Sequence, residues 1–239
     1  MTSANVTRAL FEVSDLHAYY GESHILHGVS FEVDRGEVVT LLGRNGAGKT
    51  TTLRAIMGMV GKRSGSIRLD RVELCQLSSD KVARAGIAYC PEERGIFASL
   101  DVAENLMLPP RINDRGMTVD QIYELFPNLK ERVHSSGTRL SGGEQQMLAI
   151  ARILRTGADM LMLDEPTEGL APVIIQQIRN VILRLKENGY TILLVEQNFP
   201  FAASVANRHY VMEHGRIVDS VPNERIDQNM HRLQQYLGL

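Results

Sequence analysis

The sequence predicts an α/β protein whose mostly parallel sheet carries packed helices and is interrupted by a helical insertion. Strand and helix patterns alternate after Asp159, and such alternation favours a parallel sheet covered by helices. A glycine-rich turn at residues 43–48 joins an apolar strand to a helix, as α/β folds do at their ligand sites. Between Leu100 and Thr156 strand signals stop and helical spacing takes over, which indicates an insertion of roughly fifty residues.

Composition places the chain among ordinary globular proteins. Of its 239 residues 44% are hydrophobic and 23% charged, so a core of normal size is available. A formal net charge of −2 argues against wholesale binding to nucleic acid, which leaves a basic footprint. No apolar run approaches the ~18–20 residues that cross a bilayer, and residues 1–8 lack the apolar stretch of a secretory signal. Cys75 and Cys90 have no metal-type spacing, which favours a reduced cytosolic compartment.

The first third of the chain is predicted to be rich in β-strands. Its apolar or alternating runs are short and are broken by glycine and proline. The expected elements are strands at 11–13, 24–33 and 37–42, a helix from Lys49 towards Gly58, a glycine-rich turn at Gly61–Gly65, and strands at 66–69 and 86–90.

The rest of the chain begins with helical spacing and ends in alternation. One helix face is predicted by four apolar residues at i, i+3, i+4 and i+7, namely Ile122, Leu125, Phe126 and Leu129. The C-terminal tail repeats this kind of spacing, and we expect it to form a helix packed on its own domain. The elements expected after Asp159 are strands at 160–163, 191–195 and 210–212 and a helix at 174–185.

Residues Gly43–Thr50 fit the pattern G-x-x-x-x-G-K-[ST] in its expected context, between a strand and a helix. Glycines let successive backbone N–H groups curl around a phosphate, and the following helix adds the positive end of its dipole. Lys49 would reach the β- and γ-phosphates as a point charge, and the Thr50 hydroxyl would ligate Mg²⁺. The expected ATP-binding residues of this loop are Gly43, Arg44, Asn45, Gly46, Ala47, Gly48, Lys49, Thr50 and Thr51.

An apolar run from Met160 ends in two carboxylates, Asp164 and Glu165. The carboxyl end of a buried strand is where α/β folds place their ligands. Asp164 would hold Mg²⁺, and Glu165 would accept a proton from the water that attacks ATP. An acidic turn after a strand is common, and only the phosphate loop earlier in the chain gives this one a specific meaning.

The stretch Leu140–Glu144 contains two glycines at the start of a predicted helix. Ser141 and Glu144 have capping-box spacing, which is an ordinary structural explanation for those two residues. It does not explain Gly142 and Gly143, because glycine in a helix costs up to about 1 kcal/mol relative to alanine. Bare backbone at a helix N-terminus beside a hydroxyl indicates a second phosphate-binding half-site.

The chain resembles the ATP-binding-cassette (ABC) ATPases over essentially its whole length. The resemblance lies in the order of three motifs with a helical insertion between them, namely Gly43–Thr51, Leu140–Gln146 and Asp164–Glu165. The resemblance implies a P-loop NTPase core of ABC type, with a mostly parallel sheet and an N-terminal antiparallel β subdomain, plus a helical subdomain. Residues 1–95 and 157–239 would form the core with its C-terminal helix, and residues 96–156 the helical subdomain. It also implies a head-to-tail dimer, in which one ATP lies between the phosphate loop of one subunit and five signature residues of the other, Leu140, Ser141, Gly142, Gly143 and Glu144.

Single positions carry over from the resemblance as well. Tyr20 matches the aromatic residue that stacks on adenine, with Tyr19 as the competing candidate. Glu92 stands where the family usually has a glutamine that senses Mg²⁺, and it joins Thr50 and Asp164 as an expected metal ligand. Gln197 stands where the family usually has a histidine that contacts the γ-phosphate. A glutamine donates its amide but does not titrate near neutral pH, so more of the catalysis would depend on Glu165.

The departures at positions 92 and 197, with Gly169–Pro172, are similar to the shorter ATPase of branched-chain amino acid importers. Residues 19–30 and 166–169 also fit the sister importers of urea and short-chain amides, which stay an alternative. The resemblance implies a second ATP-binding subunit, identical or related, two membrane permease subunits contacted near residues 92–105, and indirectly a solute-binding protein. The chain would then lie peripherally on the cytoplasmic face of the inner membrane.

Two other classes remain as rivals. A soluble cassette ATPase outside transport usually has two cassettes or a long coiled-coil insertion, and this sequence shows neither. A P-loop kinase would not need Leu140–Glu144. A metal site at His24 and His27 is a further possibility, but the sequence shows no third ligand for it.

Overall fold

The computed structural model describes residues 9–238, so residues 1–8, on which the signal-peptide interpretation rests, lie outside it. Its strands are β1 Phe11–Tyr20, β2 Ser23–Val33, β3 Val38–Leu42, β4 Lys62–Leu69, β5 Val72–Glu73, β6 Ile87–Cys90, β7 Met160–Asp164, β8 Thr191–Glu196, β9 Arg208–Glu213 and β10 Arg216–Pro222. Its helices are α1 Lys49–Ile56, α2 Ser79–Ala85, α3 Val102–Met107, α4 Val119–Leu125, α5 Pro127–Glu131, α6 Gly142–Thr156, α7 Pro172–Glu187, α8 Phe199–Val205 and α9 Ile226–Leu237, with short 3₁₀ turns at Gly137–Arg139 and Asn223–Arg225.

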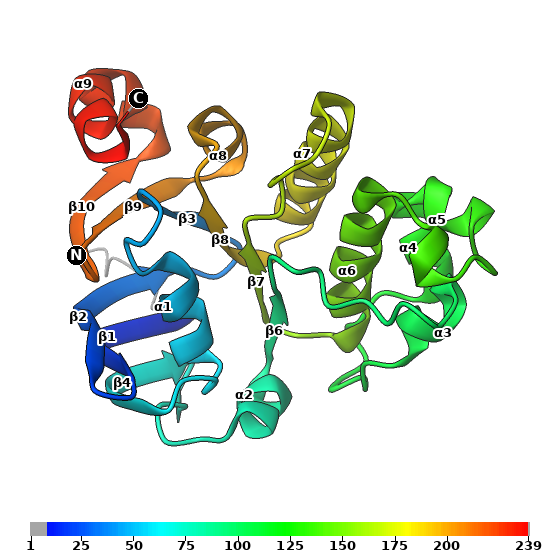
Figure 1. Cartoon of the computed structure of the whole chain (residues 1–239), viewed down its shortest axis with the longest axis horizontal. Coiled ribbons are helices and arrows are strands. Elements are labelled where there is room, and N and C mark those ends of the chain that lie inside the picture. Colours follow the sequence, from blue (N-terminus) through cyan, green and yellow to red (C-terminus); the bar gives the residue numbers. More distant parts are fainter. Residues whose placement is uncertain (1–8, 239) are drawn as a thin grey trace, which may run out of the picture.

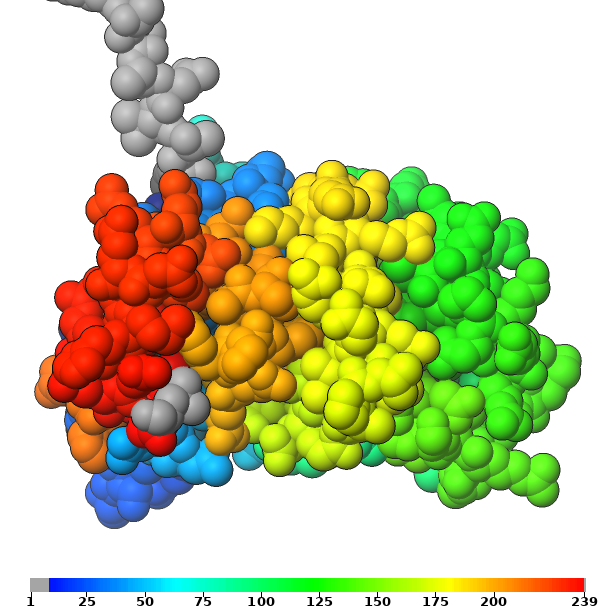
Figure 2. All heavy atoms as spheres, turned by 90° about the horizontal axis from the view of Figure 1, so that it is seen from above, coloured from blue at the N-terminus to red at the C-terminus, as the bar shows by residue number. Residues whose placement is uncertain are grey.

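The larger sheet confirms the predicted α/β class. Its six strands run in the order β10-β9-β3-β8-β7-β6, and every neighbouring pair except β10–β9 is parallel. All residues of β3, β7 and β8 are buried, which matches the continuous apolar runs of a sheet covered on both faces. Helices α7 and α8 lie beside this sheet, and Figure 2 shows them in one row with α9 across one face of the molecule.

A second, antiparallel sheet of four strands in the order β2-β1-β4-β5 packs near α1. The turn predicted at Gly61–Gly65 is wrong, because β4 already begins at Lys62. Gly65 is needed inside that strand for another reason. It has φ +109°, and a Cβ there would meet the backbone of Asp15, where the register of β1 shifts.

Helices α3–α6 gather on one side of β6 and β7 (Figure 1). The helix face predicted from Ile122 to Leu129 is split between two helices: α4 ends at Leu125 and α5 starts at Pro127. Phe126 has φ −128° and ψ 72°, because a residue that precedes proline is pushed out of the helical region. Ile122, Phe126 and Leu129 are nevertheless buried in the same cluster, so the predicted face is apolar as expected.

The C-terminal helix packs on its own domain, as predicted. Leu233 of α9 is fully buried in a cluster with Leu42, Phe199 and Val211. This cluster holds α9 against β9 and β10, beside α8 (Figure 1). Among residues 9–238, no helix is both long enough and apolar enough to cross a membrane.

Candidate active site

The phosphate loop lies between the end of β3 and the start of α1. A Cβ at Gly43 would run into the carbonyl oxygen of Met212, because β9 passes directly beside the loop. Gly48 caps α1 with φ 106°, in the left-handed region where only glycine is unstrained. The carbonyl of Ala47 accepts a hydrogen bond of 2.9 Å from the amide of Gly215, in the turn between β9 and β10. The conformation of the loop is therefore stabilised by contacts with β9 and the turn that follows it, as well as by its own glycines.

The Lys49 side chain folds back over this loop. Its Nζ donates to the carbonyls of Gly43 and Arg44, at 2.9 and 3.2 Å, and only 4% of the side chain is exposed. It also lies 3.5 Å from Oε1 of Glu165. A buried ammonium held in this way is a fixed point charge at the centre of the loop.

Asp164 ends β7 and is 1% exposed. Its carboxylate accepts hydrogen bonds from the Thr50 hydroxyl at 3.1 Å and from the Tyr89 hydroxyl at 2.9 Å. Burial raises the pKa of Asp164, and the two hydroxyls oppose that effect. A buried carboxylate beside a threonine hydroxyl fits a hard cation such as Mg²⁺, which would offset the unfavourable burial of the negative charge.

Glu92 is exposed, and its negative charge contributes to the raised pKa of Asp164. Within residues 9–238, no three His, Cys, Asp or Glu side chains form a group that could hold a metal alone. The phosphates of ATP would therefore have to supply ligands, as is usual for Mg²⁺.

Glu165 follows Asp164 in a left-handed backbone conformation, with φ 46°. A residue other than glycine in this region costs of order 1–3 kcal/mol, and such residues cluster at functional sites. The carboxylate lies between two cationic or donor groups: Lys49 on one side and the amide of Gln197, which donates to Oε2 at 2.6 Å, on the other. The structure thus brings both predicted catalytic residues together.

The signature segment lies apart from this cluster. Ser141 caps α6 in a reciprocal capping box with Glu144, and it is exposed to solvent. In Figure 1, α6 lies on the far side of β6 and β7 from α1, so the two segments predicted to be phosphate half-sites belong to helices on opposite sides of these strands. Gly143 also has a packing reason that the sequence did not reveal, because a Cβ there would come within 2.8 Å of Ile174 in α7.

The two tyrosines at the end of β1 differ in their surroundings. Tyr19 stacks on His24 with ring centroids 4.3 Å apart, and Lys62 lies over its ring. Tyr20 is 41% exposed. An adenine ring needs a free aromatic face, which favours Tyr20 over Tyr19.

Two contacts at the site are not predicted by the sequence. Tyr89 reaches Asp164 because β6 pairs in parallel with β7, a neighbour relation that the sequence does not state. Thr167 and Glu196 form a buried hydrogen bond of 2.7 Å just behind Glu165 and Gln197. Within the run Val195–Asn198, the sequence predicts a role only for Gln197.

The strands β3, β8 and β7 are adjacent and parallel. Their carboxyl ends therefore lie together, and the residues that follow them, Lys49, Gln197 and the pair Asp164–Glu165, meet there. This arrangement defines the class of the protein, a P-loop NTPase. Known proteins agree with it. The family model described as "ABC transporter" matches residues 26–168.

Two curated relatives span nearly the whole chain. It is 46% identical to the high-affinity branched-chain amino acid transport ATP-binding protein BraG of Pseudomonas aeruginosa, over 92% of this chain and 96% of that protein. It is 34% identical to the lipopolysaccharide export system ATP-binding protein LptB of Escherichia coli, over 96% and 98%. A solved ATP-binding subunit of an ABC transporter is 28% identical, with TM-score 0.80, over 96% of this chain and all of that one. The chain belongs to the ABC transporter family and is one of its ATPases.

Proposed function

We propose that this chain is the ATP-hydrolysing subunit of an importer for branched-chain amino acids. The observation that carries this proposal is the 46% identity to BraG, against 34% for the export protein LptB, at similar coverage. A second relative, a probable branched-chain amino acid transport protein LivF of Archaeoglobus fulgidus, is 36% identical over 89% of this chain. The urea and short-chain amide importers remain the alternative.

In the proposed reaction, Lys49 and the loop amides bind the phosphates of ATP, and Glu165 accepts a proton from the attacking water. Gln197 orients that carboxylate through the 2.6 Å hydrogen bond and would donate to a γ-phosphate oxygen. Thr50, Asp164 and Glu92 would hold Mg²⁺, which offsets phosphate charge when bound. Tyr20 would stack on the adenine.

The rest of the ATP site would come from a second subunit. Leu140–Glu144 of one subunit would meet the phosphate loop of the other, because the two half-sites lie on opposite sides of β6 and β7 in one chain (Figure 1). We assign the core to residues 1–95 and 157–239 and the helical subdomain to about 96–156. The second subunit would be another copy or a related ATPase.

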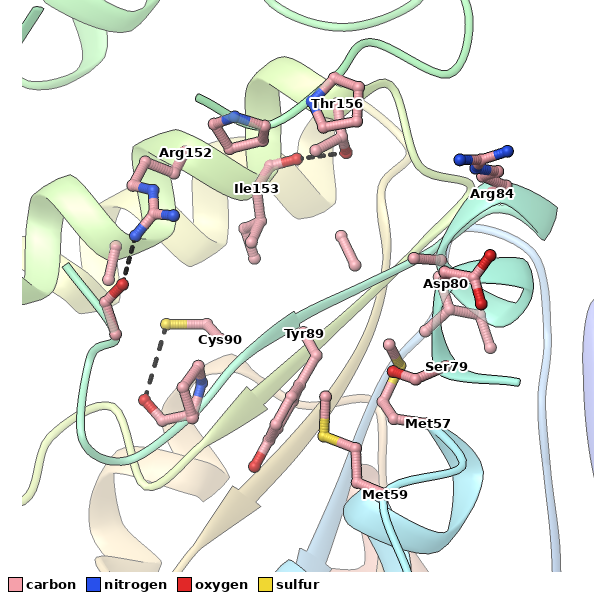
Figure 3. A pocket seen from close by; sticks show the side chains of 18 of the residues that line it. Met57, Met59, Ser79, Asp80, Arg84, Tyr89, Cys90, Arg152, Ile153 and Thr156 are labelled. Atoms are coloured by element: carbon pink, nitrogen blue, oxygen red, sulfur yellow. Dashed lines mark hydrogen bonds between the residues drawn. The ribbon is translucent and has the colours of Figure 1, made fainter. Parts of the chain in front are cut away.

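A groove of about 1000 Å³ beside β6 supports a contact with the permease. It lies between α2, β6 and α6, and Figure 3 shows Tyr89 and Cys90 on one wall and Arg152 and Ile153 on the other. The groove includes residues 93–95, which lie within the stretch 92–105 expected to meet the permease. Docking there would place the chain peripherally on the cytoplasmic face of the membrane.

The amino acid assignment is tested in the whole complex. We expect a tag on this chain to co-purify two permease subunits, and the reconstituted complex to hydrolyse ATP faster when its binding protein carries leucine, isoleucine or valine. Stimulation by urea or a short amide, and not by these amino acids, would favour the sister importer instead.

Replacing Gln197 by histidine is expected to have a mild effect, within about threefold in turnover, because either side chain donates a hydrogen bond. The histidine has an ordinary pKa near 6.5, so turnover of the variant should acquire a new dependence on pH around that value. Steady-state ATPase rates from pH about 5.5 to 8 measure both effects. A loss as large as that of a Glu165 variant would contradict the auxiliary role given to Gln197.

A further inference from the structure

Glu196 is the last residue of β8, and its carboxylate is buried behind the catalytic pair, with only 2% of the residue exposed. It accepts four hydrogen bonds. One oxygen accepts from the amide and the hydroxyl of Thr167, at 3.2 and 2.7 Å. The other accepts from the amides of Gln197 and Asn198, at 3.2 and 3.1 Å.

These partners belong to two segments that carry the catalytic groups. Thr167 lies two residues after Glu165, in the turn that leaves β7, and Gln197 begins the turn that leaves β8. The amide of Glu165 also donates to the carbonyl of Val195, at 2.9 Å. The strained φ of Glu165 and the 2.6 Å hydrogen bond between Gln197 and Glu165 are both kept only if the two turns hold a fixed position relative to each other.

We propose that Glu196 is a positioning residue for ATP hydrolysis, whose ionised carboxylate ties the turn after Glu165 to the turn that carries Gln197. The inference rests on the catalytic roles given to Glu165 and Gln197 under the proposed function. Glu196 does not touch the reacting atoms. It acts by accepting hydrogen bonds from both turns at once, from Thr167 in one and from Gln197 and Asn198 in the other. Among the described hydrogen bonds, no other side chain accepts from both turns.

The chemistry of the four donors explains why the residue must be an ionised acid. A carboxylate has acceptor sites for all four donors, whereas a glutamine would turn its own NH₂ group towards two of them. A protonated Glu196 would likewise lose acceptor capacity. Burial raises the pKa of Glu196 to about 7. The four hydrogen bonds favour the ionised form and oppose this rise only in part.

Few other charges act on this group. Asp164 and Glu165 at the end of β7 are the acidic residues nearest along the neighbouring strand, and Lys49 lies beside Glu165. The sequences of β3 and α8, on the other sides, contain no ionisable side chain. The titration of Glu196 is therefore governed mainly by its own burial and its four donors.

Two effects of that titration have opposite signs. A raised pKa in the folded state means that the folded chain binds more protons between pH 4.5 and about 7, so this group's contribution to stability falls as the pH rises through that range. Turnover should rise as the pH rises through about 7, because the ionised form holds the turns. If Glu196 acted on overall stability alone, stability would change with pH in this way but turnover would not rise through pH about 7.

The test compares Glu196→Gln and Glu196→Asp with the wild-type chain in steady-state ATPase assays from pH about 6 to 8, together with thermal unfolding. For Glu196→Gln we expect kcat to fall about 10- to 100-fold, with KM for ATP within about twofold, because misplacement of a catalytic group affects chemistry more than binding. The loss of activity below pH 7 should disappear in this variant. Glu196→Asp keeps an ionisable acid and should recover part of kcat and the pH dependence.

A control for the loss of a hydrogen-bonded carboxylate exists in the antiparallel sheet, on the exposed residue Glu73. Glu73 also accepts from a hydroxyl and two backbone amides, those of Ser66, Ile67 and Cys75. Glu73→Gln should keep wild-type kcat and pH dependence even if it lowers the unfolding temperature. Thr167→Val should lower kcat, and Thr167→Ser, which keeps the hydroxyl, should restore it.

The inference is overturned if Glu196→Gln keeps wild-type kcat, or keeps the wild-type decline below pH 7. It is also overturned if Glu73→Gln, at an equal loss of unfolding temperature, lowers kcat as much. Failure of the proposed function looks different, because then a Glu165→Gln protein would itself keep hydrolysing ATP.

Discussion

A chain with Glu165 replaced by glutamine is expected to bind ATP normally and to hydrolyse it about 10²- to 10⁴-fold more slowly, the range for loss of a general base. The geometry gives the reason. Glu165 lies between Lys49 and the side-chain amide of Gln197, and these two groups orient its carboxylate. Neither partner is an acid that would share a proton with it. Glutamine has the same shape and cannot take the proton from water.

The measurement separates binding from chemistry. ATP affinity by equilibrium titration should stay within about threefold of the wild-type value, because the loop and Lys49 are untouched. Without hydrolysis, the ATP-bound dimer should accumulate and be visible by size-exclusion chromatography. The control is Glu187→Gln at the exposed end of α7, which should behave as wild type. Substantial turnover by the Glu165 variant would remove this residue from the proposed mechanism.

Replacing Ser141 by arginine is expected to abolish ATP-dependent dimerisation and to reduce hydrolysis at least about 100-fold, while ATP binding to the single chain is unchanged. Ser141 is exposed at the start of α6, and α6 lies on the far side of β6 and β7 from α1 (Figure 1). In a dimer of this variant a bulky cation at each of the two ATP sites would block the approach of the subunits, whereas a dimer with a single arginine keeps one complete site. A site completed within one chain would instead lose ATP affinity.

Loss of a helix cap is the competing explanation, and it has a matched control. Thr118 forms the same kind of capping box at the start of α4, with Gln121, and is exposed. Thr118→Arg removes a cap worth about 0.5–2 kcal/mol but should leave hydrolysis intact.

Mixing two inactive variants tests the head-to-tail arrangement directly. A mixed dimer of Lys49→Ala and Ser141→Arg chains contains one site with both defects and one intact site. If subunits exchange at random, half the dimers are mixed and activity should recover to at most about a quarter of wild type. No recovery would mean that the two half-sites do not meet between copies of this chain.

Prediction of the secondary-structure context from sequence succeeded where the pattern is local and failed where it depends on neighbours. The phosphate loop can be recognised because its strand, glycines, lysine and helix are consecutive in the sequence. The acidic pair can be recognised because it follows the apolar run of a buried strand. The split between α4 and α5 was missed although Pro127 marks it, since the apolar spacing continues across the break. The sequence predicts a turn at Gly65 because nothing local shows that Asp15 packs against this residue.

By itself, then, the sequence determined the α/β class, the position of the loop Gly43–Thr51 between a strand and a helix, and the position of the pair Asp164–Glu165 at the end of a buried strand. Each depends on residues within one short segment, whose backbone preferences and chemistry act together. Only the tertiary structure decided which distant groups meet: Tyr89 on Asp164, Gln197 on Glu165, and Thr167 with Glu196 behind them. The physical reason is strand order, because the placement of β8 between β3 and β7 is set by packing of the whole sheet and leaves no local mark in the chain.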